Sequence, residues 1–389
     1  MSTLKNLSQP MSAGLVVAIV GFFSSFPIVL QGIKSIGANE VQAASGLMMA
    51  AIAMGVAGIG LSLWKKMPIS VAWSTPGVAL LAVTLPIEDG FAGAVAGFII
   101  AGGLTVLAGL WRPLGRLATS VPAPLAQAML AGVLVALCIA PFKAVADVPM
   151  TAIPVVVTWF VVGRFNKLFA VPAAVIAALI ITGFATDFSI SLPEKSFALP
   201  EFTTPVFSLS AFLSIGLPLF IVTMATQNIR GIAILKANGY TPPAGPLFTG
   251  VGVASVASAP FGAPATCLAA ITAAMCASED SHKDPSQRYW TAVISGGLYC
   301  VFGLFAIVIT SVAVLAPPML LETLAGVALL GVFANSASAA LADPDYREAA
   351  AVTFLVTASG ITVYGLGAAV WGLIAGGIVV LTSKQLKKT

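Results

Sequence analysis

Two short apolar segments each carry a proline in the middle, and this pattern suits the binding of a small anion. The first segment is VAWSTPG at residues 71–77, and the second is APFGAPA at residues 259–265. Proline lacks an N–H and disfavours helix in the residue before it, but it fits the first turn of a helix. We therefore expect extended chain up to about residue 74 or 262, followed by a half-helix that begins near Pro76 or Pro264.

The start of a half-helix can hold an anion, because its first N–H groups lack helical partners and carry partial positive charge. Such a break survives at membrane depth only inside protein or beside a wet cavity. Two starts that face each other would form one central site. The alternative is a pair of ordinary proline kinks, but the aromatic residues Trp73 and Phe261 at matching places before the breaks favour half-helices.

Hydroxyl and amide side chains inside two other apolar segments are candidates to complete this site. Ser24 and Ser25 lie in one segment, and Thr226, Gln227 and Asn228 lie in the other. Such groups need hydrogen-bond partners in hydrocarbon, so they face the protein interior or a cavity. We predict that they bind the ligand, and bonding between helices is the alternative for each one. The rings available to stack on an aromatic ligand are those of Phe22, Phe26, Trp73 and Phe261.

Other kinds of chemistry lack the residues that they need. The only histidine, His282, lies in a polar stretch, and the four cysteines have the spacing of neither a zinc site nor a disulfide framework. No Asp or Glu lies in the middle of the four segments described above. We therefore expect no metal, no cofactor and no enzyme active site. The lack of an acid also disfavours a cation site, whereas an anion held by amides and helix ends needs none.

The composition indicates which elements position these residues. Of the 389 residues, 59% are hydrophobic and 8% are charged, against roughly a quarter charged in soluble domains. The chain is therefore predicted to be an all-α membrane protein, in which each run of about 17–25 apolar residues spans the bilayer. The net charge of +4 reflects basic loops and gives no reason to expect nucleic acid. The fourteen predicted spans are 12–31, 43–64, 69–85, 90–111, 121–142, 148–163, 169–186, 209–235, 245–258, 261–277, 288–315, 317–333, 346–361 and 363–382.

The lysines and arginines predict the orientation, because cytoplasmic loops carry an excess of both. With these spans, fifteen lie on one side and three on the other, so we expect a multi-pass protein of a bacterial inner membrane with both termini in the cytoplasm. The N-terminus lacks the layout of a signal peptide. The majority are Lys5, Lys65, Lys66, Arg112, Arg116, Arg164, Lys167, Arg230, Lys236, Lys283, Arg288, Arg347, Lys384, Lys387 and Lys388; the minority are Lys34, Lys143 and Lys195.

Weak internal similarity indicates an inverted repeat. A shift of 202 residues sets 24–25 on 226–227 and Lys34 on Lys236, and a shift of 188 sets Pro76 on Pro264. The paired segments lie seven spans apart, and an odd offset gives the two halves opposite topology, as in many secondary transporters. We predict a first repeat at 1–203 and a second at 204–389.

The fourteen spans, the VAWSTPG and APFGAPAT breaks and the ATQNIRG stretch at 225–231 resemble the benzoate:proton symporters of the BenE family over essentially the whole chain. That family is similar to the nucleobase permeases and to the sulfate and bicarbonate transporters. The resemblance implies that spans 3 and 10 are each a short strand plus a half-helix, with the substrate between them and spans 1 and 8 beside it. It also implies two domains: a core at 12–117 plus 209–315, and a gate at 118–190 plus 316–383.

The resemblance also bears on the substrate. Nucleobase permeases hold the base with two glutamates, and the resemblance sets Gln227 and Ala263 at those positions. Both replacements are neutral, which argues against a nucleobase and suits an anion. They also remove the proton-coupling groups of those relatives, and the candidates left are Glu322, Asp187 or a proton carried by the substrate. The full predicted substrate site is Ser24, Ser25, Phe26, Trp73, Ser74, Thr75, Gln227, Asn228, Phe261, Gly262 and Ala263.

The sequence and the resemblance together predict the import of an aromatic carboxylate, benzoate, with protons, as the core moves against the gate in alternating access. The expected partners are this substrate, protons, the lipid bilayer and, as among relatives, a second copy in a homodimer. One alternative is a transporter of the same fold for an inorganic anion or a nucleobase. A channel and a membrane-embedded enzyme are further alternatives; the inverted halves disfavour the first, and the missing catalytic groups disfavour the second.

Overall fold

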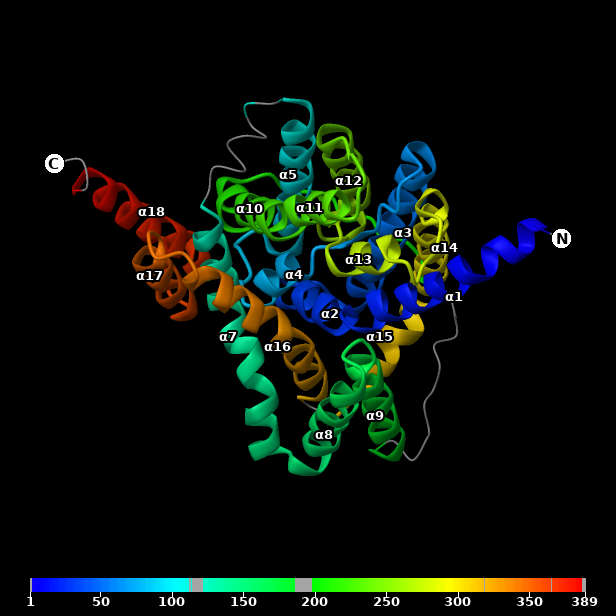
Figure 1. The fold of residues 1–389 in the computed structure, drawn as a ribbon. Coiled ribbons are helices and arrows are strands. Elements are labelled where there is room, and N and C mark those ends of the chain that lie inside the picture. The colour runs from blue at the N-terminus through cyan, green and yellow to red at the C-terminus, as the bar shows by residue number, and fades with distance from the viewer. Residues whose placement is uncertain are drawn as a thin grey trace.

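The computed structural model describes residues 2–111, 113, 122–185, 198–317, 319–364 and 366–386. Within these ranges the chain is mostly helical, with two short antiparallel sheets, as Figure 1 shows. Asp187, one of the proton-coupling candidates, lies outside the described residues.

The elements of the first half are α1 Ser2–Phe23, α2 Phe26–Ser35, α3 Glu40–Lys65, β1 Val71–Trp73, α4 Thr75–Ala82, α5 Gly90–Leu110, α7 Ala123–Asp147, α8 Pro149–Phe165 and α9 Ala170–Ala185. Those of the second half are η1 Ala211–Gly216, α10 Leu217–Thr223, η2 Met224–Asn228, α11 Ile229–Ala237, α12 Ala244–Ser258, η3 Ala259–Phe261, β2 Thr266–Leu268, α13 Ile271–Ala277, η4 Pro285–Gln287, α14 Tyr289–Leu304, α15 Ala306–Leu315, α16 Leu320–Leu341, α17 Arg347–Ala358, β3 Thr362–Val363, β4 Leu366–Gly367 and α18 Ala368–Leu386.

Many of these helices have the length and composition of membrane spans. Seven stretches in the described part are long and apolar enough to cross a bilayer. Three shorter apolar helices, α8, α9 and α18, add to them. The predicted helical membrane protein is thus confirmed. The division into fourteen spans stays a prediction, because length alone does not assign the short helices and half-helices to spans.

The helices form two groups that meet along one face (Figure 1). In the first group α3 packs against α12 and α14, α5 packs against α12, and α1 packs against α14. In the second group α7 packs against α16 and α17, α8 packs against α9, and α17 packs against α18. The two groups touch mainly through α2 against α16 and α4 against α7. The short α2 and α4 therefore lie at the boundary between the groups.

The two proline segments meet in the middle of the first group. Strands β1 and β2 pair antiparallel, with Val71 opposite Leu268 and Trp73 opposite Thr266. After β1, helix α4 begins at Thr75, and Pro76 stands in its first turn as predicted. A strand followed by a short helix is therefore present in both halves.

The second half-helix begins later than predicted. The expected start near Pro264 is wrong, because one 3₁₀ turn, a left-handed Gly262 (φ 85°) and extended chain precede β2, and α13 begins only at Ile271. Pairing with β1 fixes this extended path, and the main-chain N–H of Ser74 adds a bond of 2.8 Å to the carbonyl of Ala265. Pro264 lies just before the paired strand, where its missing N–H removes no ladder bond.

The ends of α2 and α11 match at the predicted shift of 202 residues. Helix α2 has Ile36 as its C-cap (φ −94°, ψ 12°), and Gly37 follows at φ 103°. Helix α11 has Asn238 as its C-cap (φ −94°, ψ 15°), and Gly239 follows at φ 85°. Glycine adopts positive φ without steric cost, so the same residue type ends the corresponding helix in each half.

The first and eighth predicted spans contain irregularities that were not predicted, one break in the first and two π-helices in the eighth. Helix α1 ends at Phe23 and α2 begins at Phe26, so Ser24 and Ser25 form a break. In the second half, Met224–Asn228 is a π-helix, a distortion that is frequent at functional sites. The break and the second π-helix coincide with the polar residues from which the site was predicted, and they correspond at the shift of 202 residues; the first π-helix, Ala211–Gly216, does not.

Candidate functional site

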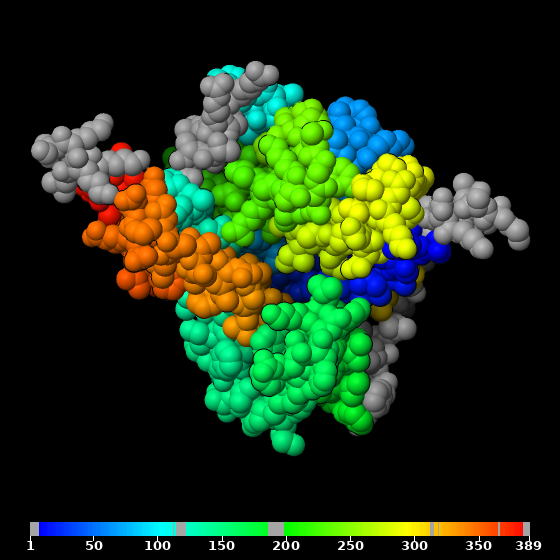
Figure 2. Space-filling model, in the orientation of Figure 1, coloured from blue at the N-terminus to red at the C-terminus, as the bar shows by residue number. Residues whose placement is uncertain are grey.

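A cavity of about 230 Å³ lies where the two groups of helices meet. Figure 2 shows the molecule hollowed between the green α8–α9 hairpin, the orange α16 and the yellow-green helices, with the blue N-terminal segment at its floor. The residues of the first group that line the cavity are Val20, Gly21, Ser24, Ser25, Ala72, Trp73, Thr75, Pro76, Gln227, Ala269, Ala270, Ile271 and Thr272. Those of the second group are Lys167, Leu168, Val171, Ala328, Leu329 and Val332.

Trp73 and Ser25 form one wall of the cavity together. The indole N–H of Trp73 donates to Ser25 Oγ at 2.9 Å, and Ser25 Oγ donates to the carbonyl of Gly21 at 3.2 Å. The Trp73 ring also meets Phe22 edge to face, with ring centroids 5.3 Å apart. These contacts fix a large aromatic side chain at the cavity, where it is 1% exposed.

The two half-helices differ at their starts. At α4, the Ser74 side chain accepts from the main-chain N–H of Gly77 at 3.2 Å and from the Thr223 hydroxyl at 2.8 Å. At α13, the residue before the first turn is Ala270, which has no side-chain oxygen to cap the helix. Since Ala270 and Ile271 both line the cavity, the uncapped N–H groups of this turn are the ones that an anion can use.

Two more polar side chains reach the cavity beside α13. The hydroxyl of Thr272 accepts from Ser70 Oγ at 2.7 Å, which ties α13 to the chain entering β1. Gln227, in the π-helix, is half-buried, and no hydrogen bond of its amide to another described residue is found. The amide is therefore available to a ligand, and its predicted role in substrate binding stays a prediction.

The structure brings some of the predicted residues together and separates others. Ser24, Ser25, Trp73, Thr75 and Gln227 line the cavity. Ser74 lies directly behind it and is fully buried as a helix cap.

Asn228 and Phe26 lie apart from the cavity lining. The Asn228 side chain accepts from the main-chain N–H of Leu268 at 2.9 Å, which is the helix-bonding alternative considered for it. Phe26 faces a separate apolar cavity of about 190 Å³ together with Phe23 and Leu324.

Phe261, Gly262 and Ala263 lie before β2 and do not line the cavity. The Phe261 ring meets Phe202 with centroids 5.8 Å apart, and its carbonyl accepts from Ser45 at 2.9 Å. Their separation follows from the late start of α13, which places Ala269–Thr272 at the cavity instead.

Sequence reasoning missed several lining residues. Thr272 and Ala270 carry no helix-start signal, and the α16 residues became neighbours only through tertiary packing. Lys167 was counted for orientation alone, although it lines the cavity from the α8–α9 turn. Among the described residues, no group of three His, Cys, Asp or Glu side chains is placed to hold a metal ion.

Comparison with known proteins identifies the family of this chain. The family model for the benzoate membrane transport protein, BenE, matches residues 6–382. The chain belongs to the BenE family. Inner membrane protein YdcO of Escherichia coli K12 is 38% identical over 369 residues, which cover 94% of this chain and 93% of that protein. The benzoate membrane transport protein of Acinetobacter baylyi is 30% identical over 378 residues, 96% of each chain. A BenE-family chain with these helices is a multi-pass membrane transporter.

Solved structures of low sequence identity have similar folds, and they include a bicarbonate transporter and an anion transporter. The transmembrane domain of the cyanobacterial bicarbonate transporter BicA has a TM-score of 0.64 at 16% identity, covering 96% of this chain and 97% of that one. SLC26A9 has a TM-score of 0.67 at 12% identity, covering 99% and 66%. Murine Slc26a9 in its inward-facing state has a TM-score of 0.62 at 13% identity, covering 97% and 68%. The BenE-family chain therefore has the fold of these transporters, which confirms the predicted fold class.

Proposed function

We propose that this transporter imports an aromatic carboxylate, benzoate, together with protons. The observation that carries the proposal is one cavity lined both by the closely packed Trp73 and by an uncapped helix start at Ala270. A carboxylate accepts hydrogen bonds from a helix start, and an aromatic ring packs on an aromatic wall. The name of the Acinetobacter relative, 30% identical over almost the whole chain, supports the same substrate.

The size and lining of the cavity suit such a ligand. Its volume of about 230 Å³ is below the roughly 300–1,000 Å³ of pockets for drug-sized ligands, so a single ring with one polar group is a suitable occupant. We place the carboxylate at the first turn of α13, beside Gln227 and Thr272. The ring then lies against Trp73, with Val20 and Val332 on its apolar edges.

The position of the cavity supports alternating access. One wall belongs to the helices that carry the half-helices, and the other belongs to α8, α9 and α16. We propose that the first group is the core, that the second is the gate, and that the core moves against the gate with the substrate bound. A site between two groups of helices is exposed to one side at a time when one group moves as a body.

For the coupling proton we favour transport on the substrate. The described residues that line the cavity include no Asp, Glu or His. Glu322, one of the candidates from sequence, is exposed in the first turn of α16 and does not line the cavity. The Glu322→Gln variant should then keep the pH profile of uptake, and a flattened profile would restore Glu322 as the proton carrier.

The proposal also covers the membrane in which the protein lies, its orientation and its oligomeric state. The Lys/Arg distribution supports both termini in the cytoplasm of a bacterial inner membrane, and the name of the Escherichia coli relative supports the same membrane. A homodimer stays the expected oligomeric state. Cysteine labelling of intact cells at the N-terminus and at residue 364 tests the orientation, because only the second position should react from outside.

Uptake into proteoliposomes tests the substrate. Purified full-length protein should accumulate labelled benzoate when the proton gradient is directed inward, and dissipation of the gradient should stop accumulation. Unlabelled sulfate, bicarbonate and uracil serve as competitors. Stronger competition by an inorganic anion or by uracil than by benzoate, or no gradient-driven uptake of any aromatic acid, would refute benzoate as the substrate.

A further inference from the structure

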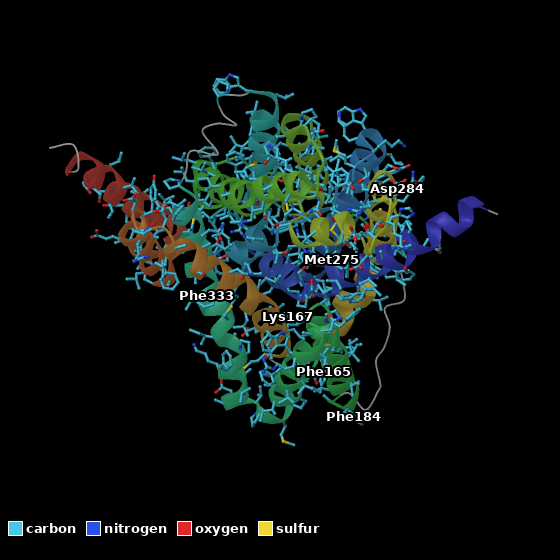
Figure 3. All side chains as sticks on the ribbon, viewed as in Figure 1. Phe165, Lys167, Phe184, Met275, Asp284 and Phe333 are labelled. Atoms are coloured by element: carbon cyan, nitrogen blue, oxygen red, sulfur yellow. The ribbon has the colours of Figure 1, made fainter. Side chains whose placement is uncertain are left out.

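Lys167 is the one charged side chain among the described residues that line the cavity. It lies in the turn between α8 and α9, and Leu168 and Val171 of the same hairpin also line the cavity. Figure 3 labels Lys167 at the end of this hairpin that meets the other group of helices. Lys167 therefore belongs to the wall opposite the half-helices.

Hydrogen bonds within the turn fix the backbone that carries Lys167. The Asn166 side chain accepts from the main-chain N–H of Leu168 at 3.0 Å, and the Asn166 carbonyl accepts from Phe169 at 3.3 Å. The Lys167 side chain is exposed, and no ion pair to it is found among the described residues. A fixed turn thus presents a cation without a counter-ion at the mouth of the cavity.

The other polar groups of the cavity are neutral. The hydroxyls of Ser24, Ser25 and Thr272, the amide of Gln227 and the N–H groups of α13 can bond to a neutral carbonyl as well as to a carboxylate. An ammonium group interacts far more strongly with an ion than with a neutral isostere of the same shape. Lys167 therefore adds a full positive charge to the partial charge of the helix start, and it is the group of the lining that discriminates most strongly by charge.

We propose that Lys167 is the counter-ion of the transported anion and the residue that selects anions over neutral ligands of the same shape. This inference rests on the proposed function, because it assigns a recognition role at the same site. Since the neutral donors and the cation lie on opposite groups of helices, the charge contact exists only while the cavity is arranged as in this structure. Lys167 thus strengthens anion binding in this arrangement and not in the alternate one.

Binding measurements on the purified full-length protein test the role of Lys167. The probes are benzoate and its neutral isostere benzamide, titrated by calorimetry at low and high salt. Lys167→Met should weaken benzoate binding by about two- to fivefold, the scale of one exposed ion pair, and leave benzamide binding unchanged. Lys167→Arg should retain benzoate binding. The salt dependence of benzoate affinity should be smaller in Lys167→Met than in the parent protein.

Arg164→Met is the matched control. Arg164 lies on the same hairpin, carries the same charge and contacts the Phe160 ring at 5.8 Å, but it does not line the cavity. This variant should bind benzoate like the parent protein. If both variants lose benzoate affinity equally, Lys167 acts only as a general surface charge. If Lys167→Met loses affinity for benzoate and for benzamide equally, the role of Lys167 is structural. Either result overturns the proposal.

Bicarbonate and sulfate, titrated in parallel, separate failure of this inference from failure of the proposed function. Binding of one of these anions in place of benzoate would refute the benzoate proposal, and its weakening in Lys167→Met alone would still support the counter-ion role. If benzoate binds and Lys167→Met matches the parent protein, the counter-ion role is refuted while the proposed function stands. An absence of binding by all three anions would refute both.

Discussion

The indole N–H of Trp73 donates a hydrogen bond of 2.9 Å to Ser25 Oγ, and this bond joins strand β1 to the break between α1 and α2. The two residues come from different spans, and both line the cavity. The bond fixes the orientation of the Trp73 ring against which we place the substrate ring. The break at Ser25 and the strand at Trp73 therefore act as one unit of the site.

A double-mutant cycle on Trp73 and Ser25 tests this unit. Ser25→Ala leaves the buried indole N–H without its partner, which should cost about 1–3 kcal/mol of stability. Trp73→Phe removes the donor, so the double variant should be less impaired than the sum of the single variants. Thermal unfolding in detergent and benzoate titration provide the two readouts. Trp64→Phe, at an exposed tryptophan (60%), is the control, and strict additivity would show that the bond does not couple the two elements.

Two neighbouring amides should behave differently on substitution. Gln227 faces the cavity, so Gln227→Leu should weaken benzoate binding by about tenfold, the scale of one hydrogen bond to a charged group, with little loss of stability. Asn228 is fully buried and accepts from the N–H of Leu268. Asn228→Leu should therefore lower stability by about 1–3 kcal/mol, because it orphans that N–H. Calorimetric binding and thermal unfolding of both variants separate the effects, and the reverse pattern would move the binding role to Asn228.

The first proline element could be predicted because its sequence carries local signals. Ser74 is a good N-cap residue and Pro76 fits the first turn of a helix. These two residues therefore predict a helix start at the place where α4 begins. A similar signal marks the break in the first span, where Pro27 stands in the first turn of α2 just after Ser25. Pro27 lies inside a continuous apolar run, which is typical of one unbroken membrane helix. The break before it was therefore not predicted.

The second proline element could not be placed from local signals. Its helix start has Ala270 as the cap, which gives no signal, and Pro264 stands before a strand that is held by pairing with the distant Val71. A pattern based on proline therefore selects Phe261 and its neighbours in place of Thr272. Lys167 reaches the cavity only because the α8–α9 hairpin packs beside α16. The spacing of residues along the sequence does not predict tertiary packing of this kind.

Close contact between α2 and α4 gives a prediction about stability. A Cβ atom at Gly32 would lie 2.5 Å from the main-chain oxygen of Val78 in α4, closer than real atoms approach. Gly32→Ala should therefore force the two helices apart and cost about 1–3 kcal/mol, as overpacking in a core does. Gly60→Ala is the control, because nothing lies within 4 Å of the added atom. Thermal unfolding of both variants checks this, and equal midpoints would show that α2 adjusts freely against α4.

An acid introduced before α13 tests how the anion is held. In Ala270→Asp the new carboxylate can accept from the N–H groups of the first turn, so it occupies the place that we assign to the substrate carboxylate. The helix should keep its stability or gain up to about 1 kcal/mol from the cap, while benzoate affinity should fall more than tenfold because like charges repel. Ala270→Ser caps without charge and should lose less affinity. Calorimetry and thermal unfolding of the two variants provide the measurement. Unchanged benzoate binding in the folded Ala270→Asp protein would place the carboxylate away from α13, and then the aromatic wall at Trp73 would be the only part of the assigned pose left to test.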